Sequence, residues 1–391
     1  MIPLMKKAFL NEHETKKALA DFILKTDKLS MDAKCAEFEK AFAKKQGSKE
    51  AILFNSGGSA NLAMLQALKN LGKLKDGDVV GFSALTWSTN VMPIIQMGLR
   101  PSAIDCELTT LNVMSHNVLE SIKKSKLNAL FLTNVLGFAG DIDKIKKICE
   151  ENNILLLEDN CEALGTELSV GKTGTFGLGA SFSFFVAHHM STIEGGMICT
   201  NNDDLAEMLC IVRANGWDRN LTAEQQIKWR KRYDIKSEFQ AKYTFYDLGF
   251  NFRPTEITGF LGLFQLQFLD ENIKTREKNY LRLEKIIKQN PDLISLRHDH
   301  ITALSTFAFP IVCKTPELRD KYLNQFSGAG IEIRPMIAGN MQKQPFYHKY
   351  IKEVLDLSGA DFLHKNAFYC GNYPELSENN LETISSCLYK Y

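Results

Sequence analysis

One run of residues, SFSFFVAHHMSTIEGG at positions 181–196, concentrates side chains suited to proton transfer. An apolar strand pattern ends near Phe185, two histidines follow, and a Glu-Gly-Gly turn closes the run. An imidazole accepts and donates protons near neutral pH. Adjacent residues of an extended segment point in opposite directions. We therefore expect only one of His188 and His189 to face a reaction centre.

A glycine- and serine-rich turn, NSGGSANLAML at residues 55–65, follows an apolar run and precedes a helical pattern. Gly58 and Ser59 lie where that helix would begin. The free N–H groups and partial positive charge of a helix start bind anions, and small residues allow close approach. The turn is a candidate phosphate site, although similar turns also occur without a ligand. Asn61 either takes part in such a site or is polar filler, a helix-compatible residue with no specific role.

Two acids, Glu158 and Asp159, end the apolar run in LLLEDNCEALG, residues 155–165. Active sites of α/β sheets lie at the carboxyl ends of strands. A carboxylate there can pair with a protonated pyridine nitrogen and make the ring an electron sink. It can equally cap a helix or lie in a loop. We assign the pairing role to Asp159 and a supporting or structural role to Glu158.

Aromatic and basic residues occur in other turns. Trp87, in FSALTWSTN, offers a flat surface to a ring-shaped ligand or packs as a partly buried aromatic. Arg253, in LGFNFRPTEITG, can grip a carboxylate or phosphate with two hydrogen bonds, or form a surface ion pair. Arg334 precedes a Gly339-Asn340 turn that either closes over a substrate or is an ordinary loop.

The elements that must position these side chains are strands and helices in alternation, from about residue 15 to 215. The near-continuous apolarity of the strand patterns suits a sheet covered on both faces. Such alternation predicts an α/β fold with a mainly parallel sheet. The expected strands occupy residues 51–54, 79–82, 129–133, 154–157, 181–185 and 197–200, and the expected helices residues 59–71, 119–124 and 142–152.

The rest of the chain predicts a different organisation. Polar residues 221–243 form an excursion from the core, and one long helix follows from about residue 255 to 289. A smaller α+β domain comes next, with a strand within residues 302–312 and a helix over 316–328. We therefore divide the chain into a large domain with an N-terminal arm, residues 1–255, and a linking helix with a small domain, residues 256–391.

Composition indicates an ordinary soluble protein. Of 391 residues 45% are hydrophobic, and 47 Lys+Arg against 46 Asp+Glu give a net charge of +1. This balance gives no electrostatic case for nucleic acid or a membrane surface. No apolar run approaches the ~20 residues that span a bilayer, and the N-terminus lacks a signal-peptide pattern. We expect a cytoplasmic protein.

The nine cysteines are scattered, with no C-x-C or C-x-x-C pair. An odd, widely spaced set argues against a disulfide framework and fits a reducing compartment. A metal or iron–sulfur site built from local cysteine pairs has no support.

The order of these segments resembles the DegT/DnrJ/EryC1/StrS family of nucleotide-sugar aminotransferases, which are pyridoxal phosphate enzymes of fold type I. The resemblance spans about residues 2–375. It implies an aspartate-aminotransferase-like fold: a large domain with a mainly parallel seven-stranded sheet, and a smaller α+β C-terminal domain. Most members carry a lysine, covalently bound to the cofactor, where this chain has His188. FSFFVAHHMSTIEGG, NGWDRN (215–220) and RPMIAGNMQKQP (334–345) resemble the lysine-lacking sugar 3-dehydratase branch.

The resemblance implies a role for each matching residue. His188 takes the place of the lysine and acts as the catalytic base, which leaves His189 turned away. Asp159 pairs with the pyridine nitrogen, and Trp87 stacks on the ring. Asn251 reaches the phosphate from the neighbouring subunit of a homodimer with shared active sites. Further implied contacts are Gly58, Ser59, Glu162 and Ser183 with the cofactor, and Arg219, Arg253 and Arg334 with the substrates.

Two positions need comment within this resemblance. Lys172, in SVGKTGTFG, precedes the SFSF strand and does not match the position of the missing lysine. Asn215 stands before GWDR where a histidine is expected, which puts one substrate contact in doubt.

The branch implies removal of the C3 hydroxyl from a nucleotide-linked 4-keto-6-deoxy sugar, with GDP as the expected nucleotide. Pyridoxal or pyridoxamine phosphate would be held non-covalently, L-glutamate would donate the amino group, and ammonia would be released. The product would be a 3,6-dideoxy sugar for a surface polysaccharide. A histidine with a pKa near neutrality could act first as base and then as acid.

Three alternatives stay open. The iron–sulfur-coupled dehydrase acting on CDP sugars also has histidine here, but it needs clustered cysteines that include a C-x-C. An ordinary aminotransferase needs the missing lysine. A catalytically idle relative would show no cofactor absorbance and no spectral change with glutamate.

Overall fold

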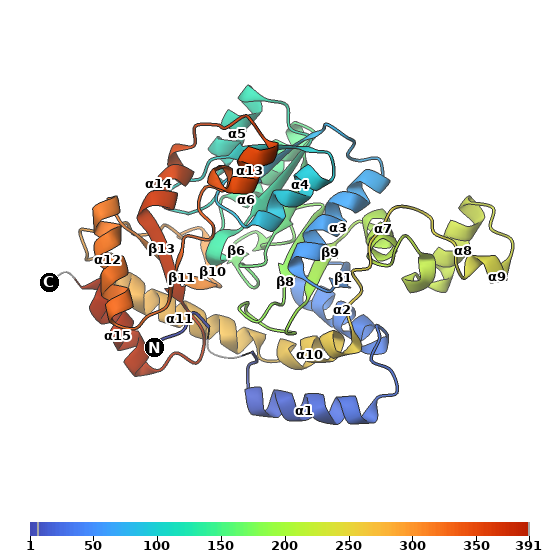
Figure 1. Cartoon of the computed structure of the whole chain (residues 1–391), viewed down its shortest axis with the longest axis horizontal. Helices are drawn as coiled ribbons and strands as arrows, with labels where there is room; N and C mark the ends of the chain where they lie inside the picture. Colours follow the sequence, from blue (N-terminus) through green and yellow to red (C-terminus); the bar gives the residue numbers. More distant parts are fainter. Residues whose placement is uncertain (6–7, 390–391) are drawn as a thin grey trace.

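A seven-stranded sheet forms the centre of the molecule in the computed structural model, which describes residues 1–5 and 8–389 (Figure 1). The strand order is β1-β9-β8-β5-β4-β2-β3. β9 runs antiparallel to both of its neighbours, and the remaining pairs are parallel. The expected mainly parallel sheet is confirmed. Its strands are β1 (Glu50–Phe54), β2 (Val79–Ser83), β3 (Arg100–Ile104), β4 (Ala129–Thr133), β5 (Leu155–Asp159), β8 (Gly179–Ser183) and β9 (Gly196–Thr200).

The central strands are apolar throughout because alternate residues pack into different cores. In β4, Ala129 and Phe131 belong to one buried cluster, whereas Leu130 and Leu132 belong to another on the opposite face. β3 was not expected from the sequence. Its segment, RPSAI, lies at the edge of the sheet and is only partly buried, so it does not need an apolar run.

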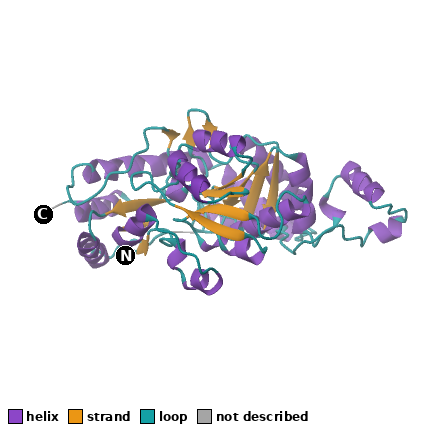
Figure 2. Cartoon of the chain, turned by 90° about the horizontal axis from the view of Figure 1, so that it is seen from above, coloured by secondary structure: helices purple, strands orange, loops and turns teal. Residues whose placement is uncertain are grey.

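Helices cover both faces of this sheet (Figures 1 and 2). α3 packs against β8 and β9, and α6 packs against β5. The helices expected over residues 59–71 and 142–152 are confirmed, and the one expected over 119–124 begins earlier, at Ser115. The large-domain helices are α1 (Glu12–Lys25), α2 (Ala33–Gln46), α3 (Gly57–Asn70), α4 (Met92–Gln96), α5 (Ser115–Lys124), α6 (Ile142–Glu151) and α7 (Asp203–Arg213).

A three-stranded antiparallel sheet, ordered β11-β13-β12, forms the small domain. The helix expected over residues 316–328 is confirmed as α12. The strand expected within residues 302–312 is instead two strands, because residues between them bond to other loops: the Ser305 hydroxyl donates to the Leu164 carbonyl at 2.6 Å, and the Phe307 N–H donates to the Leu136 carbonyl at 3.0 Å. These elements are β10 (Ile301–Ala303), β11 (Ala308–Val312), α12 (Pro316–Gly328), β12 (Ile333–Pro335), α13 (Pro345–Tyr350), α14 (Ser358–Asn366), β13 (Ala367–Gly371) and α15 (Glu378–Leu388). β10 pairs with β6 (Glu167–Leu168), which pairs with β7 (Gly171–Lys172).

The single helix expected over residues 255–289 is wrong. Two helices occupy this stretch, α10 (Glu256–Leu266) and α11 (Leu269–Ile287). The Phe268 N–H donates to the Gln265 carbonyl at 3.1 Å, a tighter turn that ends the first helix. α10 packs on α1 and α2, whereas α11 packs on α15. The break lets the segment follow first one domain and then the other; the division after residue 255 itself stays a prediction.

Two peripheral segments complete the fold. The excursion expected over residues 221–243 contains α8 (Ala223–Arg232) and α9 (Glu238–Ala241), which project beyond the sheet (Figures 1 and 2). At the other end, Ile2 bridges to Ile331, and the Leu4 N–H donates to the Glu332 carboxylate at 2.8 Å. The helices in the described part of the chain include none with the length and apolarity to cross a membrane.

Candidate active site

A cavity of about 680 Å³ opens at the carboxyl ends of the parallel strands. We call it the strand-end cavity. Asp159, the last residue of β5, lies in its wall with Gly57 and Gly58 from the start of α3. Arg334 and the following loop of the small domain form the opposite wall. Ligands of α/β proteins bind at this edge of the sheet, and such cavities are suited to cofactors.

Both oxygens of Asp159 are held by the protein. The side chain is 4% exposed. Its Oδ2 accepts hydrogen bonds from the amides of Asn61 at 2.9 Å and Asn90 at 2.8 Å, and its Oδ1 accepts one from the Cys161 N–H at 2.9 Å. A carboxylate fixed in this way suits a cationic partner. Asn61 is therefore no filler. Asn90 was missed, and its only sequence signal is its place in the Trp87 turn.

The start of α3 forms a narrow cradle. Ser56 caps the helix, since its hydroxyl accepts the Ser59 N–H at 3.0 Å. A Cβ at Gly57 would lie 2.7 Å from the Cβ of Ser183, so a side chain there would displace the cavity wall. Gly58 and Ser183 line the cavity, and their contact with a cofactor stays a prediction. Ser59 is not among the lining residues, and its hydroxyl lies 2.8 Å from that of Ser56. N–H groups of a first helical turn are free to bind an anion.

The two histidines lie in a turn, not in an extended segment as expected. β8 ends at Ser183, and the His188 N–H donates to the Phe185 carbonyl at 2.9 Å. His188 lines the strand-end cavity. His189 is 1% exposed, and its Nε2 lies 3.1 Å from the Ser305 carbonyl oxygen. The orientation expected for His188 is present, but the turn rather than strand alternation separates the two rings.

The surroundings of His188 favour its neutral form. Burial, with the nearby guanidinium of Arg276, lowers the pKa of His188 to about 3. The imidazole is therefore neutral at physiological pH, and its buried Nδ1 has no hydrogen-bond partner. The expected pKa near neutrality is wrong for the chain by itself, because burial outweighs the favourable contact with the backbone of Cys161.

Two glutamates near Asp159 have different environments. Burial, with the charge of Asp159, raises the pKa of Glu162 to about 8. The Glu162 Oε2 accepts the N–H of Leu136 at 2.9 Å, and Leu136 has a left-handed backbone with φ 53°. Glu162 lines the strand-end cavity. Glu158 instead binds three backbone N–H groups, of residues 174, 176 and 177, which gives it the structural role expected as one alternative.

The loop after Arg334 is docked on the large domain. The Met341 N–H donates to the Ala84 carbonyl at 2.9 Å, close in sequence to Trp87, which lines the cavity and is 56% exposed. Sequence reasoning missed His364 and Tyr369 in this wall. Neither belongs to a motif. A glycine at position 339 is the indirect signal: its φ is 70°, and a Cβ there would lie 2.0 Å from the Nδ1 of His364.

Several candidates lie outside the strand-end cavity of their own chain. Asn251 is exposed and accepts a hydrogen bond from the Arg253 Nε at 3.1 Å. The Arg219 guanidinium lies 5.3 Å from the ring centroid of Trp217, beside the excursion. Lys172 donates to the Lys45 carbonyl at 2.8 Å, away from the cavity. Within residues 1–5 and 8–389, no lysine lines this cavity.

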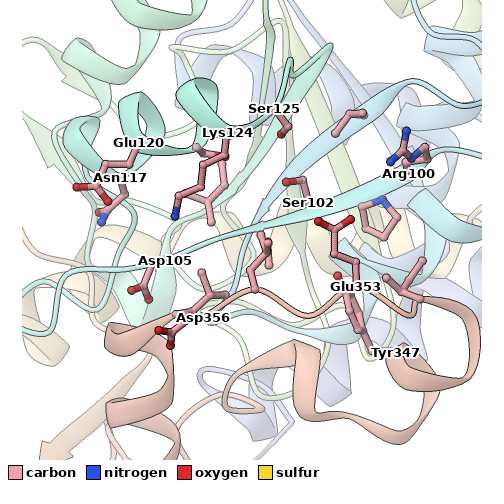
Figure 3. A pocket seen from close by; sticks show the side chains of 18 of the residues that line it. Arg100, Ser102, Asp105, Asn117, Glu120, Lys124, Ser125, Tyr347, Glu353 and Asp356 are labelled. Atoms are coloured by element: carbon pink, nitrogen blue, oxygen red, sulfur yellow. The ribbon is translucent and has the colours of Figure 1, made fainter.

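A second cavity, of about 410 Å³, lies along β3 (Figure 3). We call it the edge groove, bounded by β3, α5 and residues 350–358. None of the sequence motifs reaches it. Figure 3 shows charged side chains from all three segments around it, including Arg100, Glu120, Lys124 and Glu353, which are exposed.

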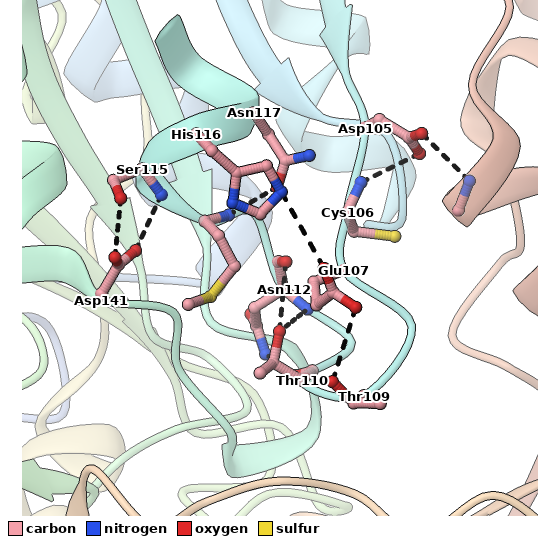
Figure 4. Close-up of polar contacts among 12 residues, drawn as sticks. Asp105, Cys106, Glu107, Thr109, Thr110, Asn112, Ser115, His116, Asn117 and Asp141 are labelled. Atoms are coloured by element: carbon pink, nitrogen blue, oxygen red, sulfur yellow. Dashed lines mark hydrogen bonds and ion pairs between the residues drawn. The ribbon is translucent and has the colours of Figure 1, made fainter. Parts of the chain in front are cut away.

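The loop after β3 connects the edge groove to the small domain (Figure 4). The Asp105 carboxylate accepts the N–H of Gly359 at 3.0 Å and that of Ala360 at 2.8 Å, which are in the first turn of α14. Ser115, at the start of α5, donates through its N–H and hydroxyl to Asp141 at 2.7 and 2.6 Å. These bonds hold the loop between β3 and α5 in place, and we call this loop the joint.

Comparison with known proteins gives one family. The model of the DegT/DnrJ/EryC1/StrS aminotransferase family matches residues 11–389. A GDP-4-keto-6-deoxy-D-mannose 3-dehydratase of Escherichia coli O55:H7 is similar to this chain, with 34% identity over 355 residues that cover 90% of each sequence.

Solved structures named GDP-4-keto-6-deoxymannose-3-dehydratase are also similar. One holds a trapped PLP–glutamate geminal diamine, with a TM-score of 0.91, 32% identity, and 99% of this chain and 100% of that chain covered. Another is a histidine-to-asparagine mutant with bound GDP-perosamine, with a TM-score of 0.90, 31% identity and the same coverage. The expected fold type I architecture is confirmed.

Proposed function

The chain belongs to the DegT/DnrJ/EryC1/StrS aminotransferase family, and on that premise we propose that it is a nucleotide-sugar 3-dehydratase. Its reaction removes the C3 hydroxyl of a GDP-linked 4-keto-6-deoxy sugar, with L-glutamate as amino donor and ammonia as a product. The similarity to the Escherichia coli dehydratase over 90% of both chains supports this reaction above amino transfer. The product is a 3,6-dideoxy sugar for a surface polysaccharide.

The strand-end cavity fits pyridoxal or pyridoxamine phosphate. Asp159 offers an oriented carboxylate to a protonated ring nitrogen, and the first turn of α3 with Ser183 offers donors to a phosphate. Trp87 offers an exposed flat ring for stacking. When bound, the coenzyme supplies an amine that links to the C4 ketone and a ring that accepts electrons. We assign Gly58 and Glu162 to the same cofactor site.

His188 carries the reaction in this proposal. The neutral imidazole takes a proton from the cofactor's C4′ carbon, and as imidazolium it gives a proton to the departing C3 hydroxyl. The covalent attachment used by lysine-bearing members is not open to an imidazole. When L-glutamate resupplies the amino group, His188 would again be the residue that moves the proton.

The substrate contacts and the assembly are part of the proposal. Arg334 faces the cavity from the small domain and is suited to an anionic group of a substrate. Asn251, Arg253 and Arg219 lie away from the cavity of their own chain. That placement agrees with a homodimer in which they reach the partner's site. We propose such a dimer, working in the cytoplasm, with Ser59 contributing through its backbone.

One observation carries the proposal: His188 lines a cavity that also holds the oriented Asp159, and no described lysine lines it. To test it, the purified protein is incubated with pyridoxamine phosphate, L-glutamate and GDP-4-keto-6-deoxymannose. Ammonia release and a sugar product that has lost the C3 oxygen, identified by mass spectrometry, are expected. A stable 4-amino sugar as the sole product would contradict dehydration and favour the aminotransferase alternative.

Two controls address the remaining alternatives. CDP-linked and heptose substrates in the same assay decide the nucleotide and the sugar. An idle relative would show no coenzyme absorbance change with glutamate. Borohydride should leave the coenzyme removable by dialysis, because no covalent bond to the chain exists to be trapped.

A further inference from the structure

Arg276, on α11, is a buried cation whose hydrogen bonds within residues 1–5 and 8–389 all go to neutral oxygens, and the nearby Glu375 carboxylate attracts it only through space. Its side chain is 4% exposed. Its Nε donates to the Asn272 side-chain oxygen at 2.7 Å, and its Nη1 donates to the carbonyls of Phe307 at 2.8 Å and Thr306 at 3.4 Å, and to that of Asn372. Burying a charge costs several kcal/mol unless it is well compensated. An uncharged side chain would avoid that cost, so the cation calls for a reason.

The groups that Arg276 binds are the groups that surround the two histidines. Asn272, oriented by Arg276, donates its amide to the His189 carbonyl. Phe307, whose carbonyl Arg276 holds, places its ring centroid 5.1 Å from that of His188 and 6.4 Å from that of His189. Arg276 therefore fixes the chain that follows His188 and the ring that packs against it.

We propose that Arg276 is a positioning residue for His188: through Asn272 and Phe307 it holds the imidazole in the strand-end cavity. This role rests on the proposed function, since a base must be held within hydrogen-bond reach of the carbon it deprotonates and must be unprotonated. The charge of Arg276 also contributes to the low pKa of His188, after burial.

Other charged or titratable groups face His188 and belong in any account of its pH dependence. A small adjoining cavity behind His188 is lined by His189, Arg276 and the arm. On the cavity side these groups are Asp159, Cys161, Glu162, Glu194, Arg334, His364 and Tyr369, and behind the ring they are His189, Arg276, Tyr373 and Glu375. Arg276 is the group among these that is both buried and bonded to Asn272 and Phe307, two residues that contact the histidine segment, which makes it the one to change.

The experiment compares Arg276→Gln and Arg276→Lys in the full-length protein. Arg213→Lys serves as the matched control, because Arg213 is also buried, at 1% exposed, and binds Glu39 and the Leu53 carbonyl on the far side of β1. Three quantities are measured: kcat against pH for ammonia release, the titration of the His188 ring by NMR of the coenzyme-free protein with labelled histidine, and the free energy of unfolding. The His188 signal is identified by its loss in His188→Asn.

Arg276→Gln should lower kcat by about 10²-fold, the scale of a small misplacement of a reacting group, and should make His188 titrate at higher pH than in the wild type. Arg276→Lys keeps the charge but not the planar fork, so it should keep the low titration point and still lose kcat. Arg213→Lys should lose stability without moving either the pH profile or the His188 titration.

A folded Arg276→Gln protein with wild-type kcat and wild-type His188 titration would overturn the role. If Arg276→Gln does not fold, Arg276→Lys decides: a reduced kcat with unchanged titration supports positioning, and an unchanged kcat overturns it. Failure of the proposed function is distinguishable, because it would appear as absent dehydration by the wild type, whereas the NMR titration needs no substrate.

Discussion

The strand-end cavity and the edge groove differ in how they hold charge, more than in size. In the strand-end cavity Asp159 is 4% exposed and its oxygens have three donors. In the edge groove Arg100, Glu120, Lys124 and Glu353 extend into solvent (Figure 3). Exposed groups stay hydrated, whereas buried and oriented groups are tuned for chemistry. A functional cavity is therefore recognised by the hydrogen bonds that hold its polar groups in place.

The largest expected difference between the strand-end cavity and the edge groove is the effect of replacing a histidine on the rate of ammonia release. His188→Asn should lower the rate of ammonia release by about 10²–10⁴-fold, because the proton acceptor in the cavity is lost. The matched control is His116→Asn, an exposed histidine on α5 beside the edge groove, whose Nε2 lies 3.9 Å from the Glu107 carboxylate. That control should turn over normally. If His188→Asn turned over at the wild-type rate, the reaction would not take place in the strand-end cavity as proposed.

The next largest effect is expected when a carboxylate is replaced in each region and the affinity for the coenzyme is compared. Asp159→Asn should weaken pyridoxal phosphate binding roughly 10- to 100-fold, the worth of a hydrogen bond to a charged group. Coenzyme affinity is measured by absorbance titration. Asp356→Asn changes an exposed carboxylate in the edge groove and should leave the affinity unchanged. Equal losses in both variants would show that net charge, not the oriented carboxylate, sets the affinity.

The pH dependence of the free energy of unfolding should also differ between variants of the strand-end cavity and variants of the edge groove. The pKa of Glu162 is raised from 4.5 to about 8, so its contribution to stability is present below 4.5 and is lost as the pH rises through about 8. At pH 9, Glu162→Gln should therefore raise the free energy of unfolding by about 1–3 kcal/mol relative to wild type, the cost of a buried polar group left without full compensation. At pH 4 the difference should vanish. Glu353→Gln in the edge groove is the control, and a flat difference across pH for Glu162→Gln would refute the assignment.

The smallest effect is expected at the joint beside the edge groove. Asp105→Ala removes the acceptor for the first turn of α14 and should cost about 0.5–2 kcal/mol, as the loss of a helix cap does. Urea unfolding measures this cost. Turnover per folded molecule should stay near that of the wild type. A marked loss of turnover per folded molecule would mean that the edge groove takes part in the reaction.

The sequence indicated the elements whose pattern is set locally. Strands buried on both faces, such as β4, need apolar residues at every position, and they were found. β3 was missed because an edge strand tolerates a sequence like RPSAI. The break at residues 267–268 was missed because residues 264–272 contain no proline or glycine to mark it, and only the different packing partners of the two helices require the bend.

For the candidate site, too, the sequence predicted the residues whose place is set locally and not those placed by long-range packing. Asp159 and Ser183 end strands, Trp87 and His188 follow strands, and Gly58 lies at the start of a helix, so topology brings all five to one edge. His364, Tyr369 and Arg276 reach that region through long-range packing of the small domain, which leaves no local pattern. The pKa of His188 also could not be read from residue type, because desolvation depends on the atoms that surround the ring.

The N-terminal arm has a practical consequence for handling the protein. Leu4 and Met5 form part of the strand-end cavity wall, and Gly371 lets the arm approach so closely that a Cβ there would lie 2.3 Å from the Leu4 oxygen. An affinity tag fused before Met1 would begin only a few residues from the strand-end cavity and would pull on this wall. Purification handles, surface tethers and fluorescent fusions are therefore better attached at the carboxyl end, behind α15.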